Sequence, residues 1–174
     1  CKARNKGINI SNGEYITFLD DDDEYLPEYI EKSINYIVKN NYEVIFGDLT
    51  LIDDNTGYKK IIKYKKNFEL NKESLLKKHL LEIISGGITF IYKKEVLNKI
   101  GGFYDIPASQ EYILMLYTIL GGYKIGYFEF SGAIGHIVNS DSKITGSQKA
   151  IDAKKEVLKL IRPHLHFLKI SDRR

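Results

Sequence analysis

The hydrophobic and polar positions of the 174-residue chain follow two periods, one typical of helices and one typical of strands. Apolar residues at helical spacing predict a helix from about Pro27 to Asn40. Further helices are predicted at Lys2–Ile10, Asn71–Leu81, Lys94–Ile100, Ser109–Leu120 and Ser147–Ile161, and strands at Glu14–Leu19, Glu43–Asp53, Tyr58–Tyr64, Gly87–Lys94 and Tyr123–Phe130. Strands that alternate with helices predict an α/β domain with a mixed sheet.

Turn and capping residues support several of these boundaries. Asn71 precedes a predicted helix as an N-cap, and Gly101-Gly102 and Gly121-Gly122 close two others. The turn 54–57 joins two predicted strands, and Pro163 stops the last helix. The chain therefore reads as one continuous domain without a linker.

Composition narrows the class of protein. A net charge of +3 excludes a strongly basic nucleic-acid-binding chain, and a single Cys excludes an intramolecular disulfide and favours a reducing compartment. No apolar run approaches the roughly 20 residues that span a bilayer, and there is no signal-peptide pattern. We therefore expect a cytoplasmic protein that has no nucleic-acid partner. If the protein contacts lipid, we expect the contact at the inner membrane surface.

The chain begins at Cys1 rather than at Met, and its first residues already read as the middle of an element. Cys1 as an N-terminal nucleophile, with its own amine as base, is one interpretation. A fragment without its natural N-terminus is the other. We expect the fragment, because no other residue supports cleavage chemistry and the predicted sheet is short on its N-terminal side.

The acidic run Asp20–Glu24, directly after the strand Glu14–Leu19, carries the strongest chemical signal. Carboxylates this close repel one another, and ligands of open α/β sheets bind beyond the carboxyl ends of strands. The run is explained by a Mg²⁺ or Mn²⁺ ion that bridges to a diphosphate, or by Asp20 as a phosphatase nucleophile. Acidic capping of the next helix is the third explanation, and it accounts for Asp23 or Glu24 but not for four aspartates.

The segment KARNKGINISNGEYITFLDDDDEYLPEYIEK resembles the family 2 glycosyltransferases of the GT-A fold. A second segment, LNKIGGFYDIPASQEYILMLYTILGGYKIGYFEF, resembles the Gly-Gly-Phe-Asp-Glu stretch of that family. The resemblance covers roughly Lys2 to Thr145. It implies a GT-A domain over 1–146, a C-terminal amphipathic helix and tail over 147–174, and missing N-terminal strands that hold the nucleotide base.

The resemblance implies a role for each matching residue around the donor. It implies that Asp22 ligates a Mn²⁺ or Mg²⁺ ion and that Asp20 faces the nucleotide ribose or the waters of the metal. Asp21 fills the variable position between them in this nucleotide-sugar site. Arg4 lies close to the nucleotide in relatives, and its alternative is a surface salt bridge.

Three further residues come from the same resemblance. Glu111 matches the catalytic base, where relatives more often have Asp; its alternative is a charge favoured at a helix N-terminus. Gly87, preceded by Gly86, lets the backbone approach the donor sugar or forms a turn. His136 completes the metal shell or is structural.

The function implied is a metal-dependent inverting glycosyltransferase of polysaccharide biosynthesis, with a UDP-sugar as the commonest family donor and a glycan or lipid-linked acceptor. A phosphatase that uses Asp20, or a non-catalytic cation-binding domain, remains as an alternative. The predicted helix Ser147–Ile161 has lysines beside an apolar face, so it either lies on an anionic membrane or packs on the domain. We favour packing, because Ala150 and Ala153 make that face only moderately hydrophobic.

Overall fold

The computed structural model describes residues 1–64, 68–84, 86–137 and 148–168 of the chain. Within this part, six strands form one mixed sheet in the order β1-β5-β3-β6-β2, with β4 paired to β3. The strands are β1 Tyr15–Thr17, β2 Glu24–Tyr25, β3 Val44–Asp53, β4 Lys59–Ile62, β5 Ile91–Lys93 and β6 Ile125–Ile137. Of the pairs formed, β3 with β6 is parallel and the others are antiparallel.

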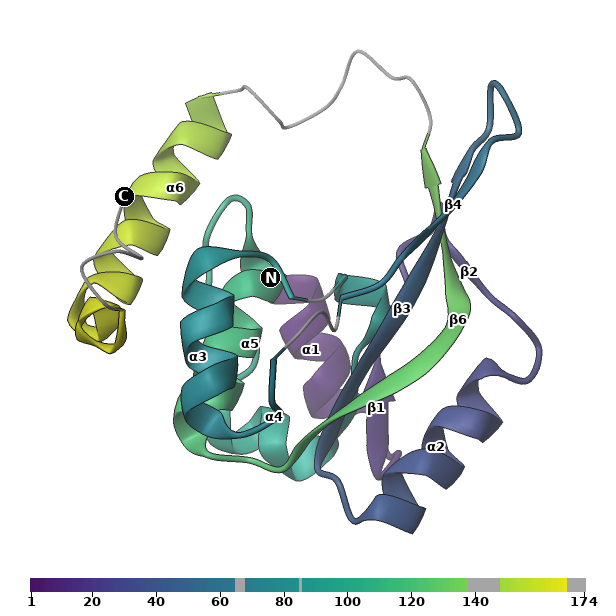
Figure 1. The fold of residues 1–174 in the computed structure, drawn as a ribbon, viewed down its shortest axis with the longest axis horizontal. Helices are drawn as coiled ribbons and strands as arrows, with labels where there is room; N and C mark the ends of the chain where they lie inside the picture. The colour runs from purple at the N-terminus through teal and green to yellow at the C-terminus, as the bar shows by residue number, and fades with distance from the viewer. Residues whose placement is uncertain (65–67, 85, 138–147, 169–174) are drawn as a thin grey trace.

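Helices cover both faces of this sheet unequally. The helices are α1 Lys2–Ile10, α2 Tyr29–Asn40, α3 Lys72–Leu81, α4 Lys94–Ile100, α5 Gln110–Gly121 and α6 Gln148–Ile161, with 3-10 turns at Gly87–Thr89 and Arg162–Phe167. Figure 1 shows α2 against one face, and α1, α3, α4 and α5 as a layer on the other, with α6 outside that layer. The described chain is thus the layered α/β domain that the sequence predicts.

The alternation of side chains along β3 divides the core in two. Val44 and Phe46 point into the larger cluster, which the helices α1, α3, α4 and α5 complete. Ile45 and Leu49 point the other way, into a smaller cluster with Tyr29 of α2. The first six residues of the central strand are therefore buried on both faces of the sheet, and its last four are half-buried.

The sequence predicted the helices well and the strands less well. The predicted strand Tyr123–Phe130 ends too early, because β6 continues to Ile137 beside β3. The predicted strand Gly87–Lys94 is wrong in its first half, because the Thr89 amide and hydroxyl both donate to the Gly86 carbonyl and close a 3-10 turn. The strand β1 is half-buried and three residues long, which is shorter than the predicted Glu14–Leu19. The prediction missed β2, whose two residues pair with β6 at Ile134 and Ala133.

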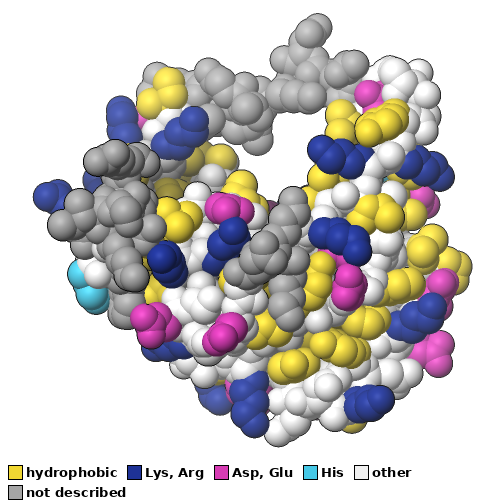
Figure 2. All heavy atoms as spheres, in the orientation of Figure 1, with side chains coloured by type: hydrophobic (Ala, Val, Ile, Leu, Met, Phe, Trp, Pro, Cys, Tyr) yellow, Lys and Arg dark blue, Asp and Glu magenta, His cyan; other side chains and the backbone are white. Residues whose placement is uncertain are grey.

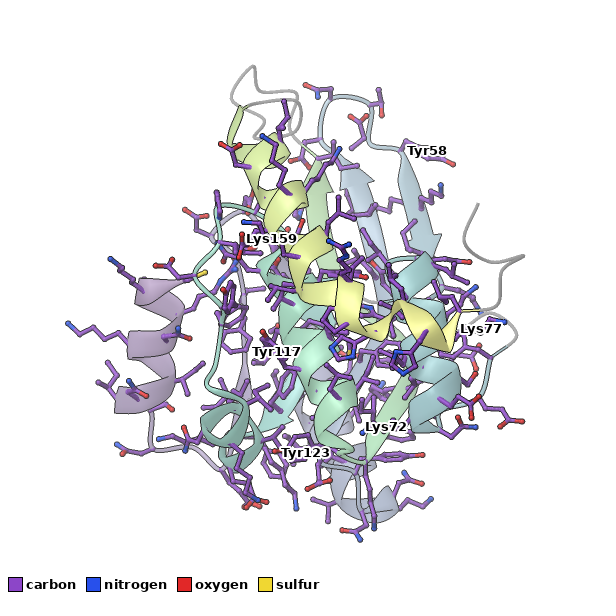
Figure 3. All side chains as sticks on the ribbon, turned by 90° about the vertical axis from the view of Figure 1, so that its left-hand side faces the viewer. Tyr58, Lys72, Lys77, Tyr117, Tyr123 and Lys159 are labelled. Carbon is purple, nitrogen blue, oxygen red and sulfur yellow. The ribbon has the colours of Figure 1, made fainter. Side chains whose placement is uncertain are left out.

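The last helix lies across the outer face of the helical layer, as Figure 3 shows from that side. Ala153 and Ile161 are buried there, and Val157 and Leu160 pack against the larger core cluster. Part of the apolar surface of α6 therefore packs on the domain, which is the arrangement that the sequence analysis favours, whereas Ile151 and Leu158 are exposed. None of the described helices combines the length and the apolar character that crossing a bilayer requires.

Candidate functional site

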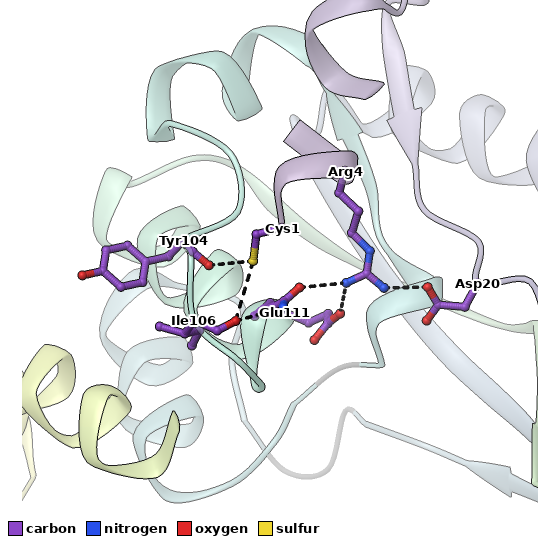
Figure 4. Close-up of polar contacts among 7 residues, drawn as sticks. Cys1, Arg4, Asp20, Tyr104, Ile106 and Glu111 are labelled. Atoms are coloured by element: carbon purple, nitrogen blue, oxygen red, sulfur yellow. Dashed lines mark hydrogen bonds and ion pairs between the residues drawn. The ribbon is translucent and has the colours of Figure 1, made fainter. Parts of the chain in front are cut away.

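The candidate site is organised around one guanidinium. Arg4 on α1 donates to the Glu111 carboxylate over 2.6 Å and to the Asp20 carboxylate over 2.5 Å. It also donates to the Gln110 side chain over 3.2 Å, and its guanidinium lies 5.3 Å from the centre of the Phe103 ring. Figure 4 shows Arg4 between the two carboxylates. Three residues that are far apart in sequence therefore meet at one cation.

The electrostatics of Arg4 follow from this position. Burial acts to lower the pKa of the Arg4 guanidinium, but the hydrogen bonds and charges of Asp20 and Glu111 outweigh it and raise the pKa. About a quarter to a half of each of the three side chains is exposed to solvent. The arrangement is therefore a solvent-accessible ion-pair network rather than a buried one.

Asn5, the residue after Arg4, attaches helix α1 to the opposite side of the site. The Asn5 side chain donates to the Phe103 carbonyl and accepts from the Phe103 amide, both over 2.8 Å. The preceding Gly102 has a positive φ of 69°, and a Cβ atom there would lie 2.5 Å from the Asn5 amide oxygen. Asn5 therefore holds α1 against the loop that leads to α5. This contact places Arg4 opposite Glu111.

Glu111 stands in the first turn of α5, where the helix dipole favours a carboxylate. A Cβ atom on Gly87 would lie 2.6 Å from Glu111 Cγ, so the glycine leaves room for this side chain. The sequence predicts that Gly87 either approaches the donor sugar or forms a turn. The structure shows a 3-10 turn that begins at Gly87, and it adds the steric limit on Glu111 at the same position. Ser109, just before the helix, has a φ of 61°, which places a strained backbone next to the candidate base.

The acidic run forms a turn between β1 and β2. The Asp23 amide donates to the Asp20 carbonyl over 3.2 Å. The Tyr25 hydroxyl lies 2.7 Å from the Ile88 carbonyl and 3.0 Å from the Phe18 carbonyl, which holds the two ends of the turn against the Gly87–Thr89 segment. Burial raises the pKa of Tyr25 to about 12, so the hydroxyl remains a neutral donor. Asp21 and Asp22 are exposed at the tip.

His136 belongs to a second cluster of polar residues, at the Asp23–Glu24 end of the acidic run. Its Nδ1 atom lies 2.7 Å from an Asp54 carboxylate oxygen, and its Nε2 atom lies 3.4 Å from Glu24. Its backbone amide donates to Asp23. Hydrogen bonding to Asp54 raises the pKa of His136, while burial raises the pKa of Asp23. The structure thus places His136 with Asp23, Glu24 and Asp54.

The chemistry of the run fits a hard divalent cation that is shared with a ligand. Within the described residues, no group of three or more His, Cys, Asp and Glu side chains is placed to hold a metal ion. A Mg²⁺ or Mn²⁺ ion at a diphosphate usually takes one or two protein carboxylates and completes its shell with phosphate oxygens and water. Asp20 and Asp22 have exposed carboxylates, so they can provide the one or two protein ligands that such an ion takes.

Sequence reasoning missed two residues of the site region. Asn5 was read as part of a matching motif, and no local signal indicates its contacts with Phe103, which is 98 positions away. Asp48 is a buried carboxylate at a bulge between β3 and β6, where it accepts a hydrogen bond from the Tyr127 hydroxyl. The Gly47-Asp48 pair interrupts an otherwise apolar strand, and this interruption is a usable signal for such a bulge.

The mixed sheet with helices on both faces is an α/β fold of the GT-A type. Residues 1–101 match glycosyl transferase family 2, and the chain belongs to this family. The match ends before Glu111, so the assignment of the base rests on the resemblance of the later segment and on the geometry around Arg4.

Two curated relatives agree with the family. The chain is 30% identical over 149 residues to an uncharacterized glycosyltransferase of Methanocaldococcus jannaschii, which covers 84% of this chain and 50% of the relative. It is 26% identical over 114 residues to the Escherichia coli enzyme UDP-Glc:alpha-D-GlcNAc-diphosphoundecaprenol beta-1,3-glucosyltransferase WfgD, with 66% of this chain and 42% of the enzyme covered. The chain spans half the length of the first relative and less of the second.

Solved structures show the same fold at low sequence identity. The crystal structure of S. aureus TarS 1-349 in complex with UDP-GlcNAc has a TM-score of 0.72 and 16% identity, covering 94% of this chain and 46% of that chain. The mannosyltransferase PcManGT from Pyrobaculum calidifontis, in complex with GDP-Man and Mn²⁺, has a TM-score of 0.57 and 14% identity. It covers 95% of this chain and 47% of that chain.

Proposed function

We propose that this chain is the metal- and acceptor-binding part of an inverting glycosyltransferase that uses a nucleotide-sugar, with a UDP-sugar as the donor. The observation that carries the proposal is the bridge from Arg4 to Asp20 and Glu111, which joins the acidic strand end to the candidate base. Family membership favours this function over a phosphatase or a non-catalytic cation-binding domain. The UDP-GlcNAc bound by TarS and the UDP-Glc named for WfgD support the choice of nucleotide.

In this mechanism the Glu111 carboxylate accepts the proton of the acceptor hydroxyl. The hydroxyl oxygen forms the new bond to the anomeric carbon of the sugar while the bond from that carbon to the diphosphate oxygen breaks. The nucleoside diphosphate leaves with that electron pair, and a single displacement inverts the anomeric centre. Arg4 orients the Glu111 carboxylate through a 2.6 Å hydrogen bond from one guanidinium nitrogen. Its other terminal nitrogen orients the Asp20 carboxylate.

A divalent ion at the acidic run would neutralise charge that develops on the leaving diphosphate. We assign it to Asp22, with Asp20 and Asp21 next to the nucleotide-sugar, and the Mn²⁺ of the PcManGT complex supports a divalent ion in this fold. His136, the second predicted ligand, would use its Nε2 atom, because its Nδ1 atom lies 2.7 Å from Asp54 and its Nε2 atom has only a 3.4 Å contact with Glu24. The acceptor is a glycan or a lipid-linked sugar, and the diphosphoundecaprenol acceptor in the name of WfgD supports the second.

The first test is the Glu111→Gln variant in the natural full-length protein. The amide keeps the size of the side chain but does not accept a proton, so we expect transfer to fall by about 10²–10⁴-fold with donor affinity unchanged. Turnover at saturating donor and the dissociation constant for UDP are measured on the same preparation.

Glu73→Gln is the matched control, because Glu73 also stands in the first turn of a helix, α3, away from Arg4. It removes the same charge from a helix N-terminus and should leave transfer unchanged. If Glu111→Gln loses donor affinity instead of rate, Glu111 is a binding residue and the base assignment is wrong.

The second test concerns the metal. Asp22→Asn removes one ligand charge from an exposed side chain, so we expect transfer to be lost and the melting temperature to be retained. Titration of Mn²⁺ followed by turnover measures the change, and Asp105→Asn, an exposed aspartate in a loop outside the acidic run, is the control. Full activity of Asp22→Asn at the Mn²⁺ concentration that saturates the wild type would refute the assignment.

A further inference from the structure

A large cavity adjoins the candidate base. Its volume is about 550 Å³, and α3, α5 and α6 contribute to its walls. Sites for small ligands typically have volumes of roughly 300–1,000 Å³. Figure 2 shows the surface hollowed between α6 and the sheet. Glu111 lines the cavity, so a ligand there reaches the carboxylate that is proposed to accept the proton.

Two consecutive glycines leave room for two polar side chains at this cavity. A Cβ atom on Gly86 would lie 2.8 Å from the hydroxyl oxygen of Tyr64, and a Cβ atom on Gly87 would lie 2.6 Å from Cγ of Glu111. All four residues line the cavity. Gly86 has a φ of −93°, which any residue can adopt, so the space beside Tyr64 is what favours a glycine there. The glycine pair therefore admits a hydroxyl and a carboxylate to one cavity.

The Tyr64 hydroxyl has no hydrogen-bond partner among the described residues. Burial and the charge of Asp48 raise the pKa of Tyr64 to about 12, so the hydroxyl stays protonated and can both donate and accept. By contrast, the hydroxyl of Tyr112, another residue of the cavity wall, donates to the His79 carbonyl. A ligand that fills the cavity displaces water from the Tyr64 hydroxyl, so it binds well only if it supplies a hydrogen-bonding group in return.

The candidate base alone does not select one hydroxyl of a sugar. One carboxylate oxygen of Glu111 accepts from Arg4 over 2.6 Å, which leaves the other oxygen for a single ligand hydroxyl. A sugar ring carries several hydroxyls of similar chemistry, and one hydrogen bond lets any of them lie at the base. A second fixed polar group is required to hold the ring in one orientation.

Resting on the transferase function proposed above, we propose that Tyr64 binds a second hydroxyl of the acceptor sugar while the reacting hydroxyl lies at Glu111. Tyr64 thereby determines which hydroxyl of the sugar reaches the base. The proposal gives a role in acceptor specificity to a residue that lies outside both segments in which the sequence resembles the family.

The test is a binding cycle on the natural full-length protein, with UDP and Mn²⁺ present so that the donor site is filled and no transfer occurs. The probes are the methyl glycosides of glucose, galactose, mannose and N-acetylglucosamine, followed by the analogues of the tightest binder that each lack one hydroxyl. Ligand-observed NMR titrations give the dissociation constants. We expect one deoxy analogue to bind wild type about tenfold more weakly than its parent, but to bind Tyr64→Phe as well as the parent does.

Two further variants separate the hydroxyl from the fold. Tyr58→Phe is the matched control, because Tyr58 is a 66% exposed tyrosine just before β4 and lies outside the cavity wall; it should keep the tenfold discrimination. Gly86→Ala displaces the Tyr64 hydroxyl without removing it, so it should lose the same discrimination as Tyr64→Phe. Affinity for UDP and the melting temperature are measured for each variant, and both should match wild type.

Equal discrimination against every deoxy analogue in wild type and Tyr64→Phe would overturn the inference, because no ligand hydroxyl would then depend on Tyr64. The absence of saturable binding by all four glycosides would overturn it as well. These outcomes differ from a failure of the proposed function: a protein that transfers from a UDP-sugar and loses activity in Glu111→Gln, but shows no coupling to Tyr64, keeps its function and loses this specificity residue.

Discussion

Gly87 determines where the Glu111 side chain can lie. A Cβ atom at this position would meet Glu111 Cγ at 2.6 Å, and Glu111 is held from its other side by Arg4. The Glu111 side chain therefore lies between the Gly87 backbone and the Arg4 guanidinium. A base that is fixed in this way is preorganised for proton transfer.

We therefore predict that Gly87→Ala displaces the Glu111 carboxylate and lowers transfer by about 100-fold. The added methyl group should also cost about 1–3 kcal/mol of the free energy of unfolding. Turnover at saturating donor and urea unfolding measure the two effects. Gly7→Ala on α1 is the control, because nothing lies within 4 Å of its Cβ position. Unchanged turnover and stability in Gly87→Ala would mean that the position of Glu111 is not critical.

The residues proposed to bind the donor and to accept the proton were easier to predict than the residues that position them. Arg4, Asp20 and Glu111 lie in recognisable local patterns, and the structure brings the three together. Asn5 acts through contacts with Phe103, and Gly87 acts through a steric limit on Glu111. Such contacts span up to about 100 positions and depend on the packed fold, so no local period or spacing reports them.

At the scale of elements, the helices were predicted closely and the strands were not. The helix α2 has apolar residues at helical spacing over 12 residues, and α3 has Asn71 as an N-cap whose side chain accepts from the Ser74 amide. In contrast, β2 has two residues and is a strand only because β6 lies beside it. The 3-10 turn Gly87–Thr89 has an apolar sequence that suits a strand, and its turn is set by bonds to Gly86.

The sequence pattern of α6 predicts that one face of the helix packs on the domain. It does not predict how α6 affects the candidate site. The sequence predicts an apolar face of Ile151, Val157, Leu158 and Ile161. Ile161 is buried and Val157 packs on the larger core cluster, whereas Ile151 and Leu158 are exposed. The pattern does not predict that this face covers the helical layer or that it forms one wall of a cavity beside Glu111. Both depend on the position of the whole helix in the fold. The path from β6 to α6, residues 138–147, lies outside the described residues.

At the scale of the whole molecule, the helical layer contains a buried titratable group that links stability to pH. His79 on α3 is 1% exposed and stacks on Tyr112 of α5 with ring centres 4.1 Å apart. Its Nε2 atom lies 2.8 Å from the Tyr112 carbonyl, and the Tyr112 hydroxyl donates to the His79 carbonyl. The Nδ1 atom is buried without a hydrogen-bond partner among the described residues. The pair thus joins α3 to α5 with a neutral imidazole.

Burial lowers the pKa of His79 from its ordinary 6.5 to about 4, while the hydrogen bond to Tyr112 opposes this shift. The unfolded chain takes up a proton at this residue below about pH 6.5, whereas the folded chain does so only near pH 4. Stability contributed by neutral His79 is therefore complete above pH 6.5 and is lost as the pH falls toward 4. The full difference corresponds to roughly 3 kcal/mol of the free energy of unfolding.

We predict that His79→Gln, which keeps a donor for the Tyr112 carbonyl but does not titrate, removes this part of the acid sensitivity. Urea unfolding of wild type and variant at pH 7, 6, 5 and 4 measures it, because carboxylates that titrate in the same range cancel in the difference. Glu111 and Lys154, which line the cavity together with His79, are unchanged in both proteins. The advantage of the wild type should shrink steadily below pH 6.5. Two curves that stay parallel down to pH 4 would show that His79 takes up its proton as readily in the folded chain as in the unfolded chain, and that the helical layer opens to water around it.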